Sequence, residues 1–111
     1  MKVFLYARVN DAGDPVKALQ EQMEIMEYYC KEHGIVIAGV EMEQCSGERL
    51  GTKLESAMDR CMTGEADAIV VRDSSRLSGD ITEVWRASKR LARHGKRILS
   101  CDGVLDAVNF S

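Results

Sequence analysis

The sequence is poor in aromatic residues and in proline, and it has no long apolar run. Aromatics make up 5% of its 111 residues, and it contains one proline and one tryptophan. The aliphatic residues and six methionines must therefore fill any core. Because no stretch of about 18 apolar residues occurs and the start does not resemble a signal peptide, we expect neither a membrane segment nor secretion. We expect a cytoplasmic protein.

Cysteine and histidine do not form a ligand pattern. The two histidines lie at no metal-ligand spacing from the four cysteines, which include no C-x-x-C pair: Cys30, Cys45, Cys61 and Cys101. We therefore expect reduced thiols and no metal site, with Cys45, in a polar segment, as the one candidate reactive thiol. Neither the G-x-x-x-x-G-K-[ST] motif nor G-x-G-x-x-G after the first apolar run is present, so no cofactor of those kinds is expected.

Charge is unevenly distributed along the chain. The formal net charge is −3, yet residues 72–97 contain eight basic and three acidic residues. Four of the basic residues recur at i, i+3, i+4 and i+7, which places them along one side of a predicted helix: Arg86, Lys89, Arg90 and Arg93. Such a side could contact a polyanion, or it could be a solvated face whose cations suit the helix C-terminus.

Apolar runs alternate with helical periodicity along the chain. We predict strands at 2–9, 35–40, 68–71 and 97–101, and helices that begin after Asp14, at Thr52 and after Asp80. Residues 41–51 read as a polar loop, Thr52 and Glu55 as a capping box, and Trp85 as part of the third helix's apolar face. This alternation predicts a single α/β domain over residues 1–111, with a small parallel four-stranded sheet covered by helices on both faces.

Arginines follow three of the predicted strands. In a parallel sheet the carboxyl ends of the strands meet at one edge, so four arginines are expected there: Arg8, Arg49, Arg72 and Arg76. Guanidinium groups match pairs of phosphate oxygens, which predicts a phosphate site. The alternative is that some of them form solvated ion pairs with Asp73, Asp80 or Asp102.

Four short motifs, in order over about residues 1–103, resemble the catalytic domain of the resolvase/invertase serine recombinases. They are Leu5-Tyr6-Ala7-Arg8-Val9-Asn10, Ala18-Leu19-Gln20-Glu21-Gln22, Ser46-Gly47-x-Arg49 and Val70-Val71-Arg72-x-x-x-Arg76-Leu77-Ser78. The resemblance implies a resolvase-like fold with flavodoxin-like winding. It also implies DNA recombination or integration, as in bacterial mobile elements, through attack of a serine hydroxyl on a backbone phosphate.

By this resemblance Arg8, Arg49 and Arg76 face the phosphate and Gln22 supports them, but the nucleophile position holds Asn10. An amide carries no hydroxyl and its nitrogen lone pair is delocalised, so Asn10 cannot attack. Two more positions depart from the family pattern: Ser75 stands where an aspartate is expected and Gly79 where an arginine is expected. We therefore expect a domain that does not cleave DNA, unless Ser74, Ser75 or Ser78 replaces the nucleophile.

Several partners fit this interpretation. The domain could keep a weak contact with DNA backbone phosphate, through a basic set that comprises Arg72, Arg86, Lys89, Arg90 and Arg93. It could also associate with itself or with a recombinase. The alternatives are an interaction module that pairs with an active recombinase without binding DNA, and an unrelated phosphoryl-handling α/β enzyme. The family continues into a separate C-terminal DNA-binding domain, which we do not expect within these 111 residues.

Overall fold

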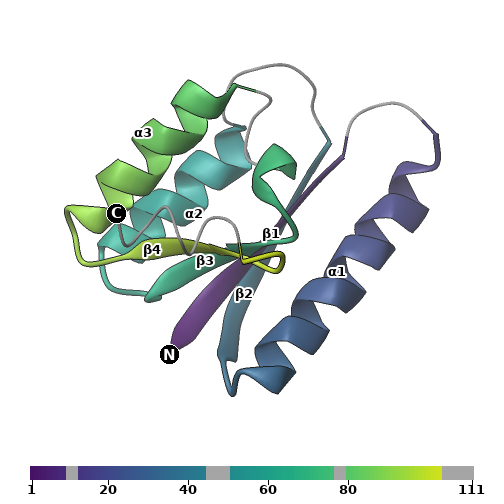
Figure 1. Cartoon of the computed structure of the whole chain (residues 1–111), viewed down its shortest axis with the longest axis horizontal. Helices are drawn as coiled ribbons and strands as arrows, with labels where there is room; N and C mark the ends of the chain where they lie inside the picture. Colours follow the sequence, from purple (N-terminus) through teal and green to yellow (C-terminus); the bar gives the residue numbers. More distant parts are fainter. Residues whose placement is uncertain (10–12, 45–50, 77–79, 104–111) are drawn as a thin grey trace.

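A computed structural model describes residues 1–9, 13–44, 51–76 and 80–103 (Figure 1). Its elements follow the order β1 (Lys2–Val9), α1 (Pro15–Glu32), β2 (Val36–Gln44), α2 (Thr52–Met62), β3 (Ala68–Val71), a short 3-10 turn η1 (Ser74–Arg76), α3 (Ile81–Ala92) and β4 (Arg97–Ser100). The strands pair in parallel in the order β2-β1-β3-β4. The predicted fold class is confirmed.

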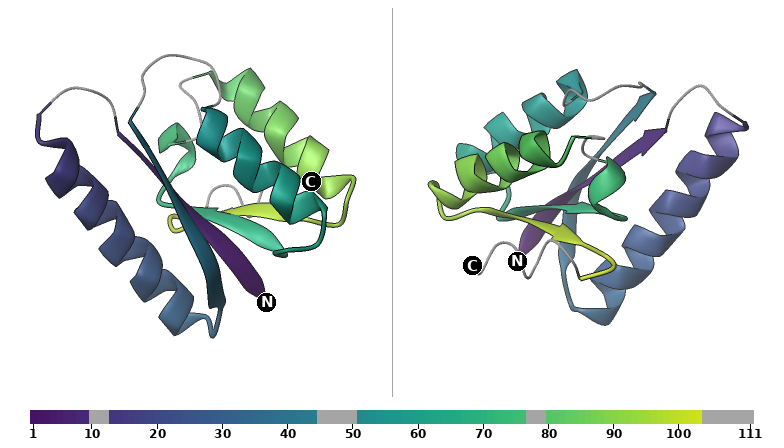
Figure 2. Two further views of the ribbon diagram at one scale, coloured as in Figure 1. Left: turned by 180° about the vertical axis from the view of Figure 1, so that it is seen from behind. Right: turned by 45° about the horizontal axis from the view of Figure 1, so that its top comes forward.

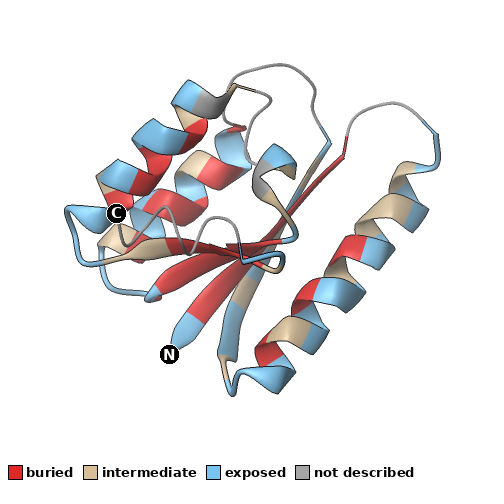
Figure 3. Ribbon diagram, viewed as in Figure 1, coloured by how far each residue is buried: buried red, intermediate tan, exposed pale blue. Residues whose placement is uncertain are grey.

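Helices cover the two faces of the sheet, with α1 on one and α2 and α3 on the other (Figures 1 and 2). The alternation of side chains along β1 explains why both faces are apolar. Val3, Leu5 and Ala7 pack with Met26 and Cys30 of α1. Phe4 and Tyr6 belong to the cluster on the opposite face, which β1, β3 and β4 share with α2 and α3 (Figure 3).

Two helix starts match the sequence prediction. Asp14 accepts a hydrogen bond from the Lys17 backbone N–H at 3.2 Å, and Pro15 occupies the first turn of α1. Asp80 accepts from the Thr82 N–H at 2.9 Å at the start of α3. At the end of α1, Gly34 has a φ of +65°, the left-handed conformation that glycine adopts without strain. Local capping therefore determines where α1 and α3 begin.

Three local predictions were wrong. The second strand continues to Gln44, because the predicted loop begins with residues that alternate in polarity and extend the pairing with β1. The N-cap of α2 is Gly51, without a side-chain cap from Thr52. Trp85 is 40% exposed, and Ala87 instead lies in the core beside Val84 and Leu91.

No helix in the described part of the chain combines the length and apolar character that crossing a bilayer requires.

Candidate phosphate site and basic surface

The carboxyl end of β1 is held by a side chain from α1. Gln22, 1% exposed, accepts a hydrogen bond from the Arg8 N–H at 3.2 Å through Oε1, and its Nε2 donates to the Arg8 carbonyl at 2.9 Å. The amide thus satisfies both backbone groups of Arg8, as a neighbouring strand would. Arg8 itself is only 6% exposed. Gln22 therefore fixes the backbone from which the Arg8 side chain extends.

Glu43 near the end of β2 links three elements, which the sequence analysis did not foresee. Its Oε2 accepts from the Tyr6 hydroxyl at 2.6 Å, and its Oε1 accepts from the Lys53 N–H at 3.2 Å and the Thr52 hydroxyl at 3.3 Å. A Cβ at Gly51 would lie 1.8 Å from Oε2, so glycine is needed for this approach. A carboxylate from β2 therefore caps the N-terminus of α2.

The charge state of Glu43 follows from these contacts. Burial by itself would raise its pKa, but the hydrogen bonds from Tyr6, Lys53 and Thr52 and the positive charge of Arg8 outweigh that effect and lower the pKa below its usual value. Glu43 is therefore a carboxylate at neutral pH, and it offsets part of the Arg8 charge.

Arg76 reaches the same edge from η1. Its Nη1 donates to the Arg8 carbonyl at 3.4 Å, so the structure brings two of the four predicted arginines together. The Nε of Arg76 lies 3.8 Å from Asp73 Oδ2, too far for a hydrogen bond, and is buried without an acceptor among the described residues. Asp73 therefore forms an ion pair with Arg76, as one alternative for these arginines predicted, while the Nε–H itself has no hydrogen-bond acceptor among the described residues.

Asp73 organises the segment between β3 and η1. Its Oδ2 lies 3.8 Å from the Nε of Arg72, which is 43% exposed at the side chain. Its Oδ1 accepts from the Ser75 N–H at 3.0 Å and also from the Ser75 hydroxyl. The Ser75 hydroxyl is thus held by a carboxylate within its own turn. Two predicted site residues, Asn10 and Arg49, lie outside the described residues, as do Gly79, Ser78 and Cys45.

The four basic residues of α3 differ in their surroundings. Arg86 is exposed and its Nη1 lies 3.3 Å from Glu83 Oε1. Arg90 is half-buried, and its Nη2 donates to Glu55 Oε2 of α2 at 2.6 Å. The Lys89 Nζ lies 5.6 Å from the centre of the Trp85 ring, and Arg93 is exposed. Arg90 therefore joins α3 to α2, whereas the other three cations are on the outer side of the helix.

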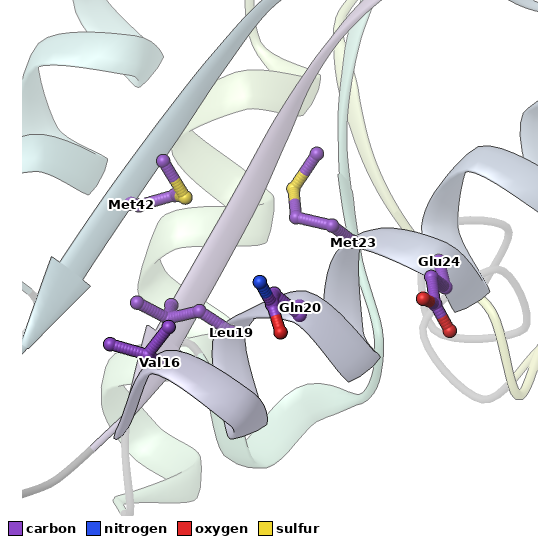
Figure 4. Close-up of a pocket in the computed structure, with 6 residues that line it drawn as sticks. All are labelled: Val16, Leu19, Gln20, Met23, Glu24 and Met42. Carbon is purple, nitrogen blue, oxygen red and sulfur yellow. The ribbon is translucent and has the colours of Figure 1, made fainter. Parts of the chain in front are cut away.

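A shallow groove of about 540 Å³ separates α1 from β2 on the opposite face of the sheet (Figure 4). Met42 of β2 and the α1 side chains line it, namely Val16, Leu19, Gln20, Met23 and Glu24. Val16 and Met42 are more than half exposed. The groove is thus an apolar surface with polar groups from α1 on its rim.

Within the described residues, no group of three or more His, Cys, Asp and Glu side chains could hold a metal ion. Cys30, Cys61 and Cys101 are free thiols, as predicted, and burial raises the pKa of the first two. These two thiols are therefore protonated and unreactive at neutral pH.

Solved structures with this fold include several recombinase domains. The catalytic domain of TP901-1 integrase aligns with a TM-score of 0.80 at 17% identity, over 99% of this chain and 95% of that one. The catalytic domain of IS1535 TnpA, an IS607-like serine recombinase, aligns with a TM-score of 0.69 at 29% identity, over 89% of this chain and 70% of that one. A resolvase family site-specific recombinase from Streptococcus pneumoniae aligns with a TM-score of 0.77 at 17% identity, over 96% of this chain and 76% of that one.

Sequence comparison gives the family directly. No curated protein matched the chain. The family model for the resolvase N-terminal domain matches residues 3–109, which is nearly the whole sequence. The suspected resemblance is therefore confirmed, and the chain belongs to the resolvase N-terminal domain family, the catalytic domain of serine recombinases.

Proposed function

We propose that this domain contacts DNA backbone phosphate at the strand-end edge but does not cleave the strand. The observation that carries the proposal is Asn10, which occupies the family's nucleophile position two residues after Arg8. Family chemistry requires an oxygen nucleophile that forms a phosphoserine link, and a carboxamide cannot provide one. Binding a phosphate in its ground state does not by itself lower the barrier to cleavage.

The contacts of Arg8 and Arg76 support a retained phosphate site. Arg8 lies in β1, and Arg76 lies in η1, after the neighbouring strand β3. The Arg76 side chain donates to the Arg8 carbonyl, and its Nε is buried without a hydrogen-bond acceptor among the described residues. Arg49 is the third phosphate-facing position of the family, and Gln22 holds the Arg8 backbone. A phosphate oxygen would satisfy the Arg76 N–H and place a negative charge beside the Arg76 guanidinium.

Two further substitutions reduce the support for chemistry. Gly79 provides no guanidinium for the charge that develops on the phosphoryl oxygens, and Ser75 provides no carboxylate. Ser75 is also a poor replacement nucleophile, because its hydroxyl is engaged by Asp73 on a different loop from Asn10. In-line attack from that loop would require the phosphate to move.

The cleavage test replaces the catalytic domain of a complete resolvase with this domain and supplies that resolvase's own DNA site. We expect no covalent protein–DNA adduct on denaturing electrophoresis, and none from Asn10→Ser alone. Asn10→Ser combined with Ser75→Asp and Gly79→Arg is expected to yield an adduct, with the intact resolvase as the positive control. An adduct from the unmodified domain, mapped to any serine, would overturn the proposal.

Phosphate binding is tested on the isolated domain by NMR titration with inorganic phosphate. We expect shifts at Arg8, Gln22 and Arg76 that disappear in Arg76→Ala. Lys31→Ala is the matched control, because it removes an exposed cation at the far end of α1. Equal loss of the response in both variants, or no response at this edge, would show that the site does not bind phosphate.

A second candidate is an interaction module that pairs with an active recombinase. The observation in its favour is the exposed apolar groove between α1 and β2. In this case Met42→Glu would abolish co-purification with a tagged active recombinase, whereas Arg76→Ala would leave it unchanged. Retention of the complex by Met42→Glu would exclude the groove as the docking surface.

A further inference from the structure

The only tryptophan of the chain lies on the surface of α3, next to cations. Trp85 is 40% exposed. One helical turn further along, Lys89 places its Nζ 5.6 Å from the centre of the indole ring. Arg93 follows after another turn and is exposed, and the Arg86 side chain beside Trp85 is 74% exposed. We call Trp85, Arg86, Lys89 and Arg93 the α3 ridge.

The ridge is not part of the hydrophobic core. The side of α3 that packs on the sheet contains Val84, Ala87 and Leu91, and Trp85 does not belong to that cluster. A single exposed apolar side chain is ordinary in a soluble domain. An exposed indole with a lysine near its ring and two exposed arginines along the same helix is a different arrangement, because it offers a flat stacking surface and positive charge on one element.

The cations of the ridge are available to a ligand. Lys89 and Arg93 make no ion pair with the described residues, and the pair between Arg86 and Glu83 is on the surface, where such pairs contribute little. Arg90, by contrast, donates to Glu55 at 2.6 Å and contacts Met58 Sδ at 3.5 Å, so its guanidinium is held by α2. Three of the four basic residues therefore face solvent, and one has a structural contact.

We propose that the α3 ridge binds single-stranded DNA, with Trp85 stacked on a base and Arg86, Lys89 and Arg93 near the phosphates. The inference extends the proposed function, since it takes DNA as the ligand of the domain, but it concerns a different surface. In an intact duplex the base faces are covered by stacking, so only the phosphates would meet the ridge. Unpaired bases expose their faces, and stacking on an aromatic side chain tolerates any sequence.

Trp85 provides the measurement in the unmodified domain, because no other tryptophan contributes to the emission. Titration with a short oligodeoxythymidylate is expected to quench and shift this emission, whereas the matched duplex produces a weaker change. In Trp85→Ala, the affinity for the labelled oligonucleotide, measured by anisotropy, should fall by about tenfold to a hundredfold, the equivalent of one lost stacking contact. Trp85→Phe should recover part of it.

Matched variants separate the ridge from other surfaces. Tyr28→Ala removes an aromatic side chain that is 66% exposed on α1, and we expect no change in affinity. Lys89→Ala and Arg93→Ala should each flatten the salt dependence by roughly 0.7 in log–log slope, as expected for one phosphate contact with a single strand. Lys31→Ala, which removes an exposed cation at the end of α1, should leave binding of the oligonucleotide unchanged.

Several outcomes would overturn the inference. One is equal affinity for single strand and duplex without quenching, and another is full affinity in Trp85→Ala. Equally tight binding of polyglutamate would assign the ridge to acidic protein segments. If duplex binds through Arg76 while the single strand leaves Trp85 unquenched, the ridge inference fails and the strand-end proposal stands. If no DNA binds and phosphate produces no response, both fail.

Discussion

The strand-end site and the α3 ridge both carry arginine, but the protein holds them in opposite ways. At the strand end, Arg8 is 6% exposed, its backbone is fixed by the buried Gln22, and a carboxylate bonded to three donors lies near its charge. On the ridge the cations are exposed, and the ion pair of Arg86 is with a neighbour one turn away. The first arrangement is preorganised, and the second is adaptable.

This difference separates two tasks that DNA contact requires. Preorganised donors fix one phosphate at one place, which reaction at that phosphate demands. Exposed cations attract a polyanion without fixing its register, and salt screens them readily. If the domain does not cleave DNA, as we propose, the first arrangement has no use in cleavage but its scaffold is still present. The substitution at Asn10 does not affect the α3 ridge, so the residues of the two surfaces can be substituted independently.

The largest expected effect comes from breaking the scaffold. Gln22→Leu keeps the side-chain size but leaves the N–H and the carbonyl of Arg8 without their partner in a buried position. We expect a loss of about 2–4 kcal/mol in the free energy of unfolding, measured in urea. Gln20→Leu, exposed one half-turn earlier on α1, should change it by less than about 0.5 kcal/mol. Similar losses in the two variants would contradict the scaffold role.

A smaller effect is expected from Glu43, and it depends on pH. Its folded-state pKa is below the ordinary value of 4.5, so its carboxylate stabilises the fold above that pH. The stabilisation is lost as the pH falls through the lower folded-state pKa. Glu43→Gln should lower stability by about 1–2 kcal/mol at neutral pH. The difference from the original chain should shrink below pH 4.5.

Thermal unfolding midpoints of the original chain and Glu43→Gln, followed from neutral to acid pH, test this prediction. Glu24→Gln, on the exposed side of α1, provides the matched control. A constant difference between Glu43→Gln and the original chain at every pH would show that the Glu43 charge plays no part.

The smallest effects on stability are expected for substitutions on α3, where they distinguish the exposed Arg86 from the half-buried Arg90. Arg86→Ala should change the free energy of unfolding by less than about 0.5 kcal/mol, because its pair with Glu83 is on the surface. Arg90→Ala should cost more, about 1 kcal/mol, since its side chain is half-buried against α2 and bonded to Glu55. Chemical denaturation measures both, and a reversed order would contradict the division of the four cations.

The buried strands and the caps of α1 and α3 could be predicted because they depend on local residue types, whereas the cap of α2 was predicted wrongly. The apolar run of β3 and the Asp14-Pro15 start of α1 are examples of such local signals. Periodicity missed the end of β2, although Met42 between two glutamates is an alternating signal. It missed the role of Glu43 because the donors of that carboxylate come from β1 and α2, distant in sequence.

Helix spacing alone also could not separate Arg90 from the other cations of α3. Its place among them is decided by Glu55, which lies 35 residues earlier in the chain. For Gln22, the family resemblance supplied a supporting role, but only the fold shows which atoms it holds. Contacts between distant segments account for most of what the sequence left open.

The central position of β1 has a consequence for how the chain is made. Of the four strands of this sheet, β1 is made before the others; it is flanked by β2 and β3, and its pairing with β3 joins Val3 to Ala68. Until β3 has been synthesised, the apolar segment from Val3 to Ala7 has no second neighbour. Such a distant pairing slows folding and prolongs the exposure of an aggregation-prone strand. Nascent chains that end before β3 should therefore depend on chaperones, and chains that include all four strands should not.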